Sequence, residues 1–384
     1  MEQINGTALM KSSLVVKEID NFFIVWIPNG NQYLRLEEPA LFVFKSHEEG
    51  KEQQTIISQC TKRYSIPENE CRIFVTEIIR GIEAIKQFAI FKESQYSDRD
   101  ELNSTIFQPF STRNYSINGK LLRFHFENLQ FENYLHPLLQ HLEIVSDSSE
   151  FVTFELFGYH EQVVLRVNHE VKGIWNKDES HLINGMAFLQ LLNAVYEKTE
   201  KDWMAIIHAS AVSNGTKTIV FTASPGSGKS TMAAMLQQKG FSLVSDDFVP
   251  LERISQHVFS FPGAMSVKEG ATELLSEWYP SLLNQKSRQT LTNKMVRYLP
   301  VDGKAVPAPV KEIIFIKYDP AVDFEMEKLP LSGSLKMLLD ETWTFPSAEN
   351  AVRFLDWYSG ISCYRLTYSN NEKALQTIIN LFEE

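Results

Sequence analysis

Several features that mark membrane, secreted or nucleic-acid-binding proteins are scarce in this sequence or missing from it. No run approaches the ~20 apolar residues that a membrane-spanning helix needs, and the opening stretch MEQINGTALMKSS has no apolar signal core. Basic residues number 37 against 48 acidic ones, and the net charge of −11 disfavours broad binding to nucleic acid. We therefore expect a cytoplasmic protein with neither a membrane nor a nucleic-acid partner.

Cysteine is also rare. Cys60, Cys71 and Cys363 cannot all pair, and no two of them have the CxxC spacing of zinc or redox sites, so we expect reduced thiols in the core. The sequence has no internal repeat, low-complexity tract or heptad pattern. The composition of the 384 residues, 43% hydrophobic and 22% charged, is typical of a globular protein. A chain of this length predicts two or three domains.

Residues 1–92 alternate apolar and polar side chains first and then show helical periodicity. The predicted elements are strands at Ser13–Lys17, Phe22–Ile27 and Gln32–Leu36, then helices at Pro39–His47, Gln53–Tyr64 and Glu68–Phe88. Pro28, Asn29 and Gly30 separate the second and third strands, as in a hairpin. This order predicts a small winged-helix α+β domain.

Residues 98–114 are polar and include the stretch RDELNST, which predicts a linker or an exposed connection. The next segment, 115–200, predicts a β-rich layer followed by a helix. Its expected elements are strands at Lys120–Phe126, Phe151–Phe157 and Gln162–Val167 and a helix at Ile183–Tyr196.

From Met204 a strand, a loop, a helix and a strand succeed one another, as in a βαβ unit with a parallel sheet. We expect residues 201–384 to form an α/β core. Its later elements are predicted as strands at Val310–Tyr318 and Cys363–Tyr368 and helices at Leu331–Leu339 and Glu372–Phe382. Aromatic side chains late in the chain are predicted to be core rather than ligand platform, namely Trp343, Phe345, Phe354, Trp357 and Tyr358.

A phosphate-binding loop is the strongest local signal. The buried-type strand Thr218–Thr222 leads into Ala223, Ser224, Pro225, Gly226, Ser227, Gly228, Lys229, Ser230 and Thr231, and a helical run Met232–Gln238 follows. Backbone N–H groups and the positive end of the helix dipole then converge on one concave spot. Lys229 is expected to reach the β and γ phosphates of ATP, and the Ser230 hydroxyl to ligate Mg²⁺. The match to GxxxxGK[ST] departs only at its first position, where Ala223 replaces glycine.

Two adjacent carboxylates follow at the end of the next predicted strand, Phe241–Ser245. Asp246 and Asp247 lie where ligands bind in open α/β sheets, so one can hold the metal while the other accepts a proton from an attacking hydroxyl. His208 ends the predicted strand Met204–Ile207. It is either a core residue or a group that stabilises charge near the γ-phosphate.

The blocks IHASAV at Ile207–Val212, ASPGSGKST at Ala223–Thr231 and LVSDD at Leu243–Asp247 resemble the HPr kinase/phosphorylase family and its kinase-like relatives. The resemblance implies a P-loop kinase domain that uses ATP and Mg²⁺. It also implies that His208 is catalytic, that Asp247 is the proton acceptor and that Asp246 is its neighbour near the metal. Lys229 would clamp phosphate and Ser230 would ligate the metal. Because these kinases assemble as rings, it further hints at a homo-oligomer.

The sequence departs from that family in two places. Thr231 stands where HPr kinases usually carry Glu, and no later LEVRGLG-like block supplies a further metal-binding Glu. The segment from Phe261, Pro262 and Gly263 to Lys268 and Glu269 stands near that position. Lys268 is therefore a candidate contact for phosphate or substrate, or else a surface lysine. Arg297 is a weaker candidate of the same kind.

The amino-terminal pattern resembles the PqqD-like fold, a leader-recognition module of ribosomally made peptide pathways. The resemblance depends on Asn31–Leu36 after the Pro-Asn-Gly turn and on the helical runs around Ile56–Tyr64 and Ile73–Ile85. It implies that a peptide adds as a strand to the sheet edge of this domain. A winged helix used only for packing or dimerisation is the alternative.

The sequence thus predicts an ATP-dependent kinase that transfers a phosphoryl group to a hydroxyl, such as Ser, of a peptide or small protein. Free serine is an alternative acceptor. Two further hypotheses are a nucleotide-switched peptide-binding protein and an ATPase whose acceptor is water. The adjacent carboxylates favour the kinase over pure binding, because a binding switch needs no base beside the acceptor.

Overall fold

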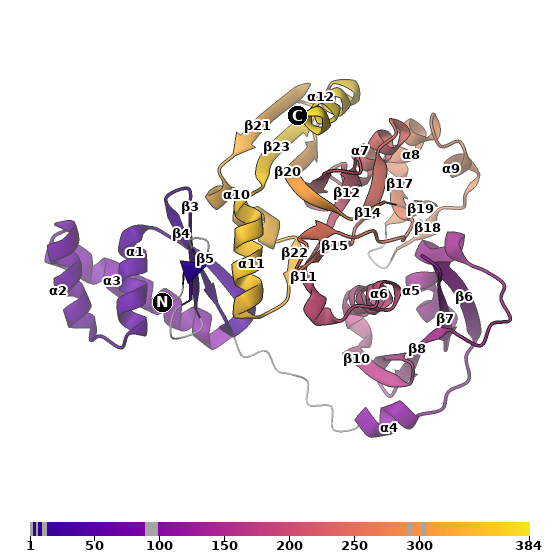
Figure 1. Ribbon diagram of the computed structural model, residues 1–384, viewed down its shortest axis with the longest axis horizontal. Helices are drawn as coiled ribbons and strands as arrows, with labels where there is room; N and C mark the ends of the chain where they lie inside the picture. The colour runs from indigo at the N-terminus through magenta and orange to yellow at the C-terminus, as the bar shows by residue number, and fades with distance from the viewer. Residues whose placement is uncertain (1–2, 5–6, 10–13, 89–98, 291–293, 302–304) are drawn as a thin grey trace. The chain divides into compact units, whose positions relative to one another are not determined.

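The structure is a computed structural model that describes residues 3–4, 7–9, 14–88, 99–290, 294–301 and 305–384 (Figure 1). Ser13, residues 89–92 and Asp98, which belong to predicted segments, lie outside the described residues. The chain is a mixed α/β protein with several sheets and divides into two units, 1–95 with 328–363 and 96–327 with 364–384. Residues 328–363 were predicted to belong to a core over 201–384, but they pack in the same unit as the amino-terminal segment.

The first unit is built on the sheet β1-β2-β3-β4-β5, in which every neighbouring pair is antiparallel. Its strands are β1 Gln3–Ile4, β2 Thr7–Leu9, β3 Val15–Ile19, β4 Phe22–Ile27 and β5 Gln32–Leu36, and a 3-10 turn, η1, spans Asn29–Asn31. Its helices are α1 Glu38–Glu48, α2 Gln53–Tyr64, α3 Glu68–Phe88, α10 Leu331–Leu339 and α11 Ala348–Ser359, with the short strand β22 at Thr342–Thr344. Within residues 14–88, the predicted order of three strands followed by three helices is confirmed.

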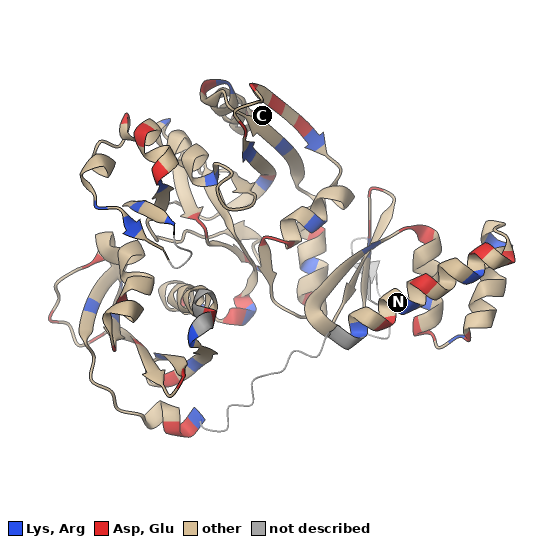
Figure 2. Ribbon diagram, turned by 180° about the vertical axis from the view of Figure 1, so that it is seen from behind, with Lys and Arg blue, Asp and Glu red and all other residues tan. Residues whose placement is uncertain are grey.

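Helices α1 and α3 pack on this sheet, α2 packs on α1 and α3, and α11 packs against β3 (Figure 1). The amphipathic α3 buries Ile82 against the sheet, while Cys71 and Val75 are buried against α1 and α2. Lys17 of β3 forms an ion pair with Asp356 of α11, which joins the carboxyl-terminal segment to the amino-terminal sheet. Figure 2 shows acidic and basic residues interspersed along α3 rather than a basic stripe.

The second unit begins with a β-rich layer. Its sheet has the order β10-β9-β8-β7-β6, with β7 and β8 parallel and the other pairs antiparallel. The strands are β6 Ser111–Ile117, β7 Lys120–Phe126, β8 Val152–Tyr159, β9 Gln162–Val167 and β10 Glu170–Asn176. Helices α4 Arg99–Ser104, α5 Leu129–Leu139 and α6 Ser180–Tyr196 accompany them, with 3-10 turns η2 Gln140–Leu142, η3 Lys177–Glu179 and η4 Glu200–Asp202.

Within the described part of the predicted linker or exposed connection, 99–114, regular structure forms at both ends, and residues 105–110 between them belong to no helix or strand. Residues 99–104 form α4, and 111–114 are part of β6. Leu102 is buried, and Nη1 of Arg166 donates to the carbonyl oxygens of Leu102 and Thr105, each at 2.8 Å. A buried arginine paired with Glu155 thus fixes a segment whose polar composition resembles a loop.

The largest sheet follows the order β14-β12-β13-β20-β16-β15-β11 in this unit, with β23 beside β20 and β21 beside β23. Its strands are β11 Trp203–Ile207, β12 Ala209–Ser213, β13 Thr218–Thr222, β14 Ser242–Asp246, β15 Val249–Glu252, β16 His257–Val258, β20 Ala308–Tyr318, β21 Phe324–Leu329 and β23 Ser362–Tyr368. Helices α7 Lys229–Gln238 and α12 Asn371–Glu383 contact each other beside it. A smaller sheet, β17-β19-β18, comprises β17 Met265–Lys268, β18 Arg288–Gln289 and β19 Met295–Leu299, and helices α8 Glu269–Ser276 and α9 Ser281–Asn284 pack beside it.

The expected βαβ unit is present as β13, α7 and β14, but its sheet is mixed rather than parallel. β12 lies between β13 and β14 and is antiparallel to both. The parallel neighbour of β13 is β20 instead. All five residues of β12 are buried, although small side chains give this segment no clear strand pattern. The insertion still leaves the carboxyl ends of β13, β14 and β20 at one edge of the sheet, because all three run in the same direction.

Candidate functional site

The predicted phosphate-binding loop, Ala223–Thr231, has the expected strand–loop–helix context. β13 ends at Thr222, and α7 begins at Lys229 after a loop in which Gly226 and Gly228 both have φ +98°. L-residues adopt this region only at a cost, so both glycines are needed for the shape of the loop. The side chain of Lys229 lies along the loop, where Nζ donates to the Ala223 carbonyl at 2.6 Å. The ammonium group of Lys229 therefore lies against the first residue of the loop.

Ser230, in the first turn of α7, contacts the end of β14. Its Oγ donates to the carboxylate of Asp246, at 2.9 Å from Oδ1 and 3.0 Å from Oδ2. Ser210 of β12 also donates to Oδ1, and the Ser266 N–H donates to the same side chain. Burial, and then the neighbouring charge of Asp247, raise the pKa of Asp246 to about 7 against these hydrogen bonds.

Asp247 has a different environment from Asp246. Its backbone has φ +63°, and half of its side-chain surface is exposed. His208, in the connection between β11 and β12, is adjacent: its Nδ1 lies 3.2 Å from the Asp247 carbonyl oxygen and 4.0 Å from Oδ1. Asp247 thus combines a left-handed backbone, which is uncommon for residues other than glycine, with an exposed carboxylate.

Lys268, the last residue of β17, reaches over the phosphate-binding loop. A Cβ built on Gly226 would lie 4.0 Å from Nζ of Lys268. Burial lowers the pKa of Lys268 most, and the nearby ammonium group of Lys294 lowers it further. The carboxylates of Asp247 and Asp246 act in the opposite direction. Cationic and anionic groups thus face one another across the loop.

His208, Asp247, Lys268 and the loop line a pocket of about 950 Å³, large enough for a nucleotide, and Asp246 is buried beside it without lining it. Of the predicted residues, it is lined by His208, Pro225, Gly226, Gly228, Lys229, Ser230, Thr231, Asp247 and Lys268. Ser224 and Ser227 belong to the loop but bond to each other instead, because Ser227 Oγ donates to the Ser224 carbonyl at 2.7 Å.

Arg297, the weaker candidate for a phosphate contact, is not among the residues that line this pocket. Its guanidinium donates to the Gln285 carbonyl at 3.2 Å and to Oγ1 of Thr272 at 3.3 Å. These contacts join β19 to the neighbouring helices.

Several lining residues were not predicted, namely Ser266, Lys294, Tyr318, Tyr368 and Asn371. They come from β17, β20, β23, α12 and the segment before β19, none of which carries a recognisable motif. A search for polar or aromatic residues at strand ends would have selected Tyr318 and Tyr368, since each ends a predicted strand.

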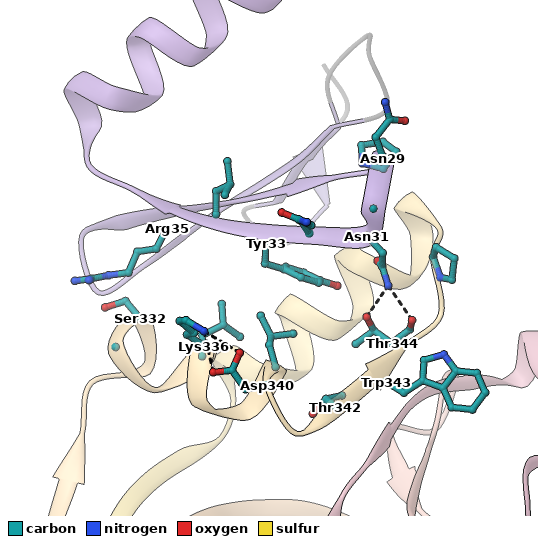
Figure 3. Close-up of a pocket in the computed structure, with 18 residues that line it drawn as sticks. Asn29, Asn31, Tyr33, Arg35, Ser332, Lys336, Asp340, Thr342, Trp343 and Thr344 are labelled. Atoms are coloured by element: carbon teal, nitrogen blue, oxygen red, sulfur yellow. Dashed lines mark hydrogen bonds and ion pairs between the residues drawn. The ribbon is translucent and has the colours of Figure 1, made fainter. Parts of the chain in front are cut away.

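A second hollow of about 970 Å³ lies in the first unit, between β5 and the segment α10–β22 (Figure 3). Among the described strands of this unit's five-stranded sheet, β5 pairs only with β4, so its outer edge is a free sheet edge. Nδ2 of Asn31 donates to the carbonyl and hydroxyl oxygens of Thr344, each at 2.8 Å, and fixes one end of the groove. Arg35 lies at its other end (Figure 3).

Trp343, at the Thr344 end of this groove, is 40% exposed, so its assignment to the core is wrong (Figure 3). Phe354, Trp357 and Tyr358 are buried as predicted, and Phe345 is half-buried. The exposed indole results from its position on the short strand β22 beside the groove rather than inside a helix.

The three cysteines are buried free thiols, as predicted. No described helix combines the length and apolarity needed to cross a membrane. Within the described ranges, no three His, Cys, Asp or Glu side chains cluster as a metal site would require. A comparison with models of known protein families finds no match, and a comparison with curated proteins finds no significant similarity.

Proposed function

We propose that the protein is an ATP-dependent kinase of the HPr kinase-like type that phosphorylates a hydroxyl, such as Ser, on a peptide or small protein. One observation carries the proposal. The phosphate-binding loop, a buried carboxylate bonded to Ser230 and an exposed carboxylate at Asp247 converge at one edge of a sheet. A phosphoryl-transfer site needs this division between a metal-holding acid and a free base.

The surroundings of Asp246 fit Mg²⁺. Its hydrogen-bond donors are the hydroxyls of Ser210 and Ser230 and the N–H of Ser266, all of them neutral. A buried carboxylate without a direct cationic partner favours a bound cation. Mg²⁺ in nucleotide sites uses one or two carboxylates together with the substrate phosphates, so no three-acid cluster is required. Ser230 and Asp246 would hold the ion, which supplies neutralisation of charge on the β and γ phosphates.

In the proposed reaction the acceptor hydroxyl oxygen forms a bond to the γ-phosphorus while the bond from that phosphorus to the β,γ-bridging oxygen breaks. ADP leaves with the bridging oxygen, and the carboxylate of Asp247 accepts the hydroxyl proton. Lys229 and Lys268 offset the charge on the transferring group, which is the larger part of catalysis for this reaction class. His208, whose Nδ1 lies 3.2 Å from the Asp247 carbonyl oxygen, would tune this base.

The groove along β5 supports a peptide acceptor. An extended peptide that adds to a free sheet edge gains main-chain hydrogen bonds, while side chains on the groove walls provide specificity. We propose that the first unit is a PqqD-like module and that Asn31, Arg35 and Trp343 border its peptide site. The α10–β22 segment, which is far from β5 in the sequence, forms the second wall of this site.

Mass spectrometry tests the proposal. The full chain is incubated with Mg²⁺, ATP and either free serine or serine-containing peptides encoded by neighbouring genes. A gain of about 80 Da, the mass of one phosphoryl group, is expected on an acceptor. The gain should disappear with Asp247→Asn and persist with Asp147→Asn, a matched change at an exposed acid outside the pocket.

The other outcomes decide between the alternatives. ADP that forms at the same rate without an acceptor indicates an ATPase. ATP that binds without turnover in the presence of every acceptor indicates a nucleotide-switched peptide binder. Either result contradicts the kinase proposal.

A further inference from the structure

The nucleotide pocket extends beyond the phosphate-binding loop on the side opposite the paired acids. In the sheet order, β14 with Asp246 lies on one side of β13, and β20 followed by β23 lies on the other (Figure 1). Tyr318 at the end of β20, Tyr368 at the end of β23 and Asn371 at the start of α12 line the pocket there. The proposed chemistry at the acids does not use this side.

The backbone of Tyr318 is fixed against the loop. Its N–H donates to the Ser227 carbonyl at 2.9 Å, and a Cβ built on Gly228 would lie 3.6 Å from Cβ of Tyr318. The side chain is nevertheless 48% exposed. Tyr318 therefore has a fixed backbone and a partly exposed aromatic ring, and it lines the pocket beside the loop.

The ring of Tyr368 packs against the ring of Tyr318. The two rings meet edge to face, with centroids 5.8 Å apart and an interplanar angle of 87°. Tyr368 is buried, and its carbonyl oxygen accepts from the Asp319 N–H at 2.9 Å, so the ends of β20 and β23 are joined directly after Tyr318. Pre-organisation of this kind lowers the entropy lost when a ligand stacks on the exposed ring.

A nucleoside triphosphate has a charged end and a flat aromatic end. If the loop holds the β-phosphate and the acids mark the γ-phosphate, the nucleoside extends from the loop toward β20 and β23. We propose that Tyr318 is the stacking platform for the nucleobase in this pocket. The inference rests on the proposed nucleotide-binding function and adds to it the residue that recognises the base. Stacking is sequence-tolerant, because every base has a π face.

The test separates the base from the phosphates. Binding of ATP and of inorganic tripolyphosphate, each with Mg²⁺, is measured by calorimetry for the wild-type chain, Tyr318→Ala and Tyr318→Phe. Loss of one stacked base contact predicts that Tyr318→Ala weakens ATP binding roughly 5- to 100-fold. Tripolyphosphate binding should change less than about twofold, because the loop contact of Tyr318 uses its backbone N–H. Phe should bind like Tyr, since it retains the ring.

Phe110→Ala removes an exposed aromatic side chain outside the pocket and is the control. Equal weakening of ATP and tripolyphosphate by Tyr318→Ala would show that the ring supports the loop, and unchanged ATP binding would show that the ring does not contact the base. Either result overturns the inference while the phosphate-binding function stands. A wild-type chain that binds neither ligand would instead overturn the proposed function, and the inference with it.

Discussion

Replacement of Gly228 by alanine tests how the phosphate-binding loop is held. Gly228 has φ +98°, and a Cβ at this position would lie 3.1 Å from the hydroxyl oxygen of Tyr368. The left-handed backbone costs an L-residue about 1–2 kcal/mol. The close approach to a buried tyrosine should add about 1 kcal/mol, because the ring or the loop must shift by a few tenths of an ångström. We therefore expect Gly228→Ala to lower the free energy of unfolding by about 2–3 kcal/mol.

Gly240 provides a matched control. Its φ is +93°, but a Cβ there would meet nothing within 4 Å, so Gly240→Ala should cost only the backbone term of about 1–2 kcal/mol. Tyr368→Phe removes the hydroxyl that the new Cβ would approach. In the double variant Gly228→Ala/Tyr368→Phe, about 1 kcal/mol of the loss should be recovered.

Urea unfolding, followed by tryptophan fluorescence and far-UV circular dichroism, measures the four variants under identical conditions. Binding of tripolyphosphate should also weaken in Gly228→Ala and not in Gly240→Ala, because only the first residue shapes the loop. A Gly228→Ala protein no less stable than Gly240→Ala would refute the argument that Tyr368 packs against the loop. The same conclusion would follow if Tyr368→Phe recovered nothing.

Three further predictions concern other parts of the chain. Because the pKa of Asp246 is raised to about 7, above the value near 3.9 of an unfolded chain, the metal-free protein should lose stability as pH rises from about 4 to about 7. Asp246→Asn should remove this loss, on the order of 2–4 kcal/mol, in urea unfolding at pH 5 and pH 8 with chelator. Arg166→Ala should lower the free energy of unfolding by about 3–5 kcal/mol, because it leaves Glu155 buried without its partner at 2.7 Å. Trp343→Ala should raise the KM for a peptide acceptor about tenfold with little change in kcat.

Each of these predictions has its own control. A pH slope that persists in Asp246→Asn would assign the titration to another group. For Arg166→Ala, a loss below about 1 kcal/mol would match an exposed ion pair and contradict the buried one. Trp278→Ala, at an exposed indole outside both pockets, should leave the KM unchanged. Equal effects of the two tryptophan changes would argue against a peptide site in the groove.

The local pattern of apolar and polar residues was sufficient to predict many of the helices and strands. The boundaries of β4, β5, α2, α3, β7, β9, β13 and α10 agree with those predicted. Each has an unambiguous period or an explicit turn on its flank, as with Pro28 to Gly30 before β5. The strand–loop–helix context of Ala223–Thr231 was equally clear, since its glycines and lysine follow a buried strand and open a helix. Such features depend on residues that are neighbours in the sequence, so they can be predicted from the sequence alone.

The sequence pattern was insufficient for segments whose composition does not match their environment in the fold. Residues 99–104 are polar, yet they fold as α4 because the buried guanidinium of Arg166, distant in sequence, binds their carbonyl oxygens. β12 consists of small residues without a clear alternation, and only its partners on both sides define it as a strand. The sequence also could not show that Arg297, a weaker candidate for a phosphate contact, donates to Thr272 and Gln285.

By itself, the sequence determined the strand–loop–helix context of the glycine-rich loop and most of the helices and strands, because short-range periodicity and backbone requirements fix these. The tertiary structure decided which distant residues join them. It placed Lys268 over Gly226, Tyr318 and Tyr368 against Gly228, and residues 328–363 in the unit with the amino-terminal sheet. The physical reason is that packing and hydrogen bonds between strand ends depend on sheet order. Sheet order is a property of long-range pairing that no local pattern records.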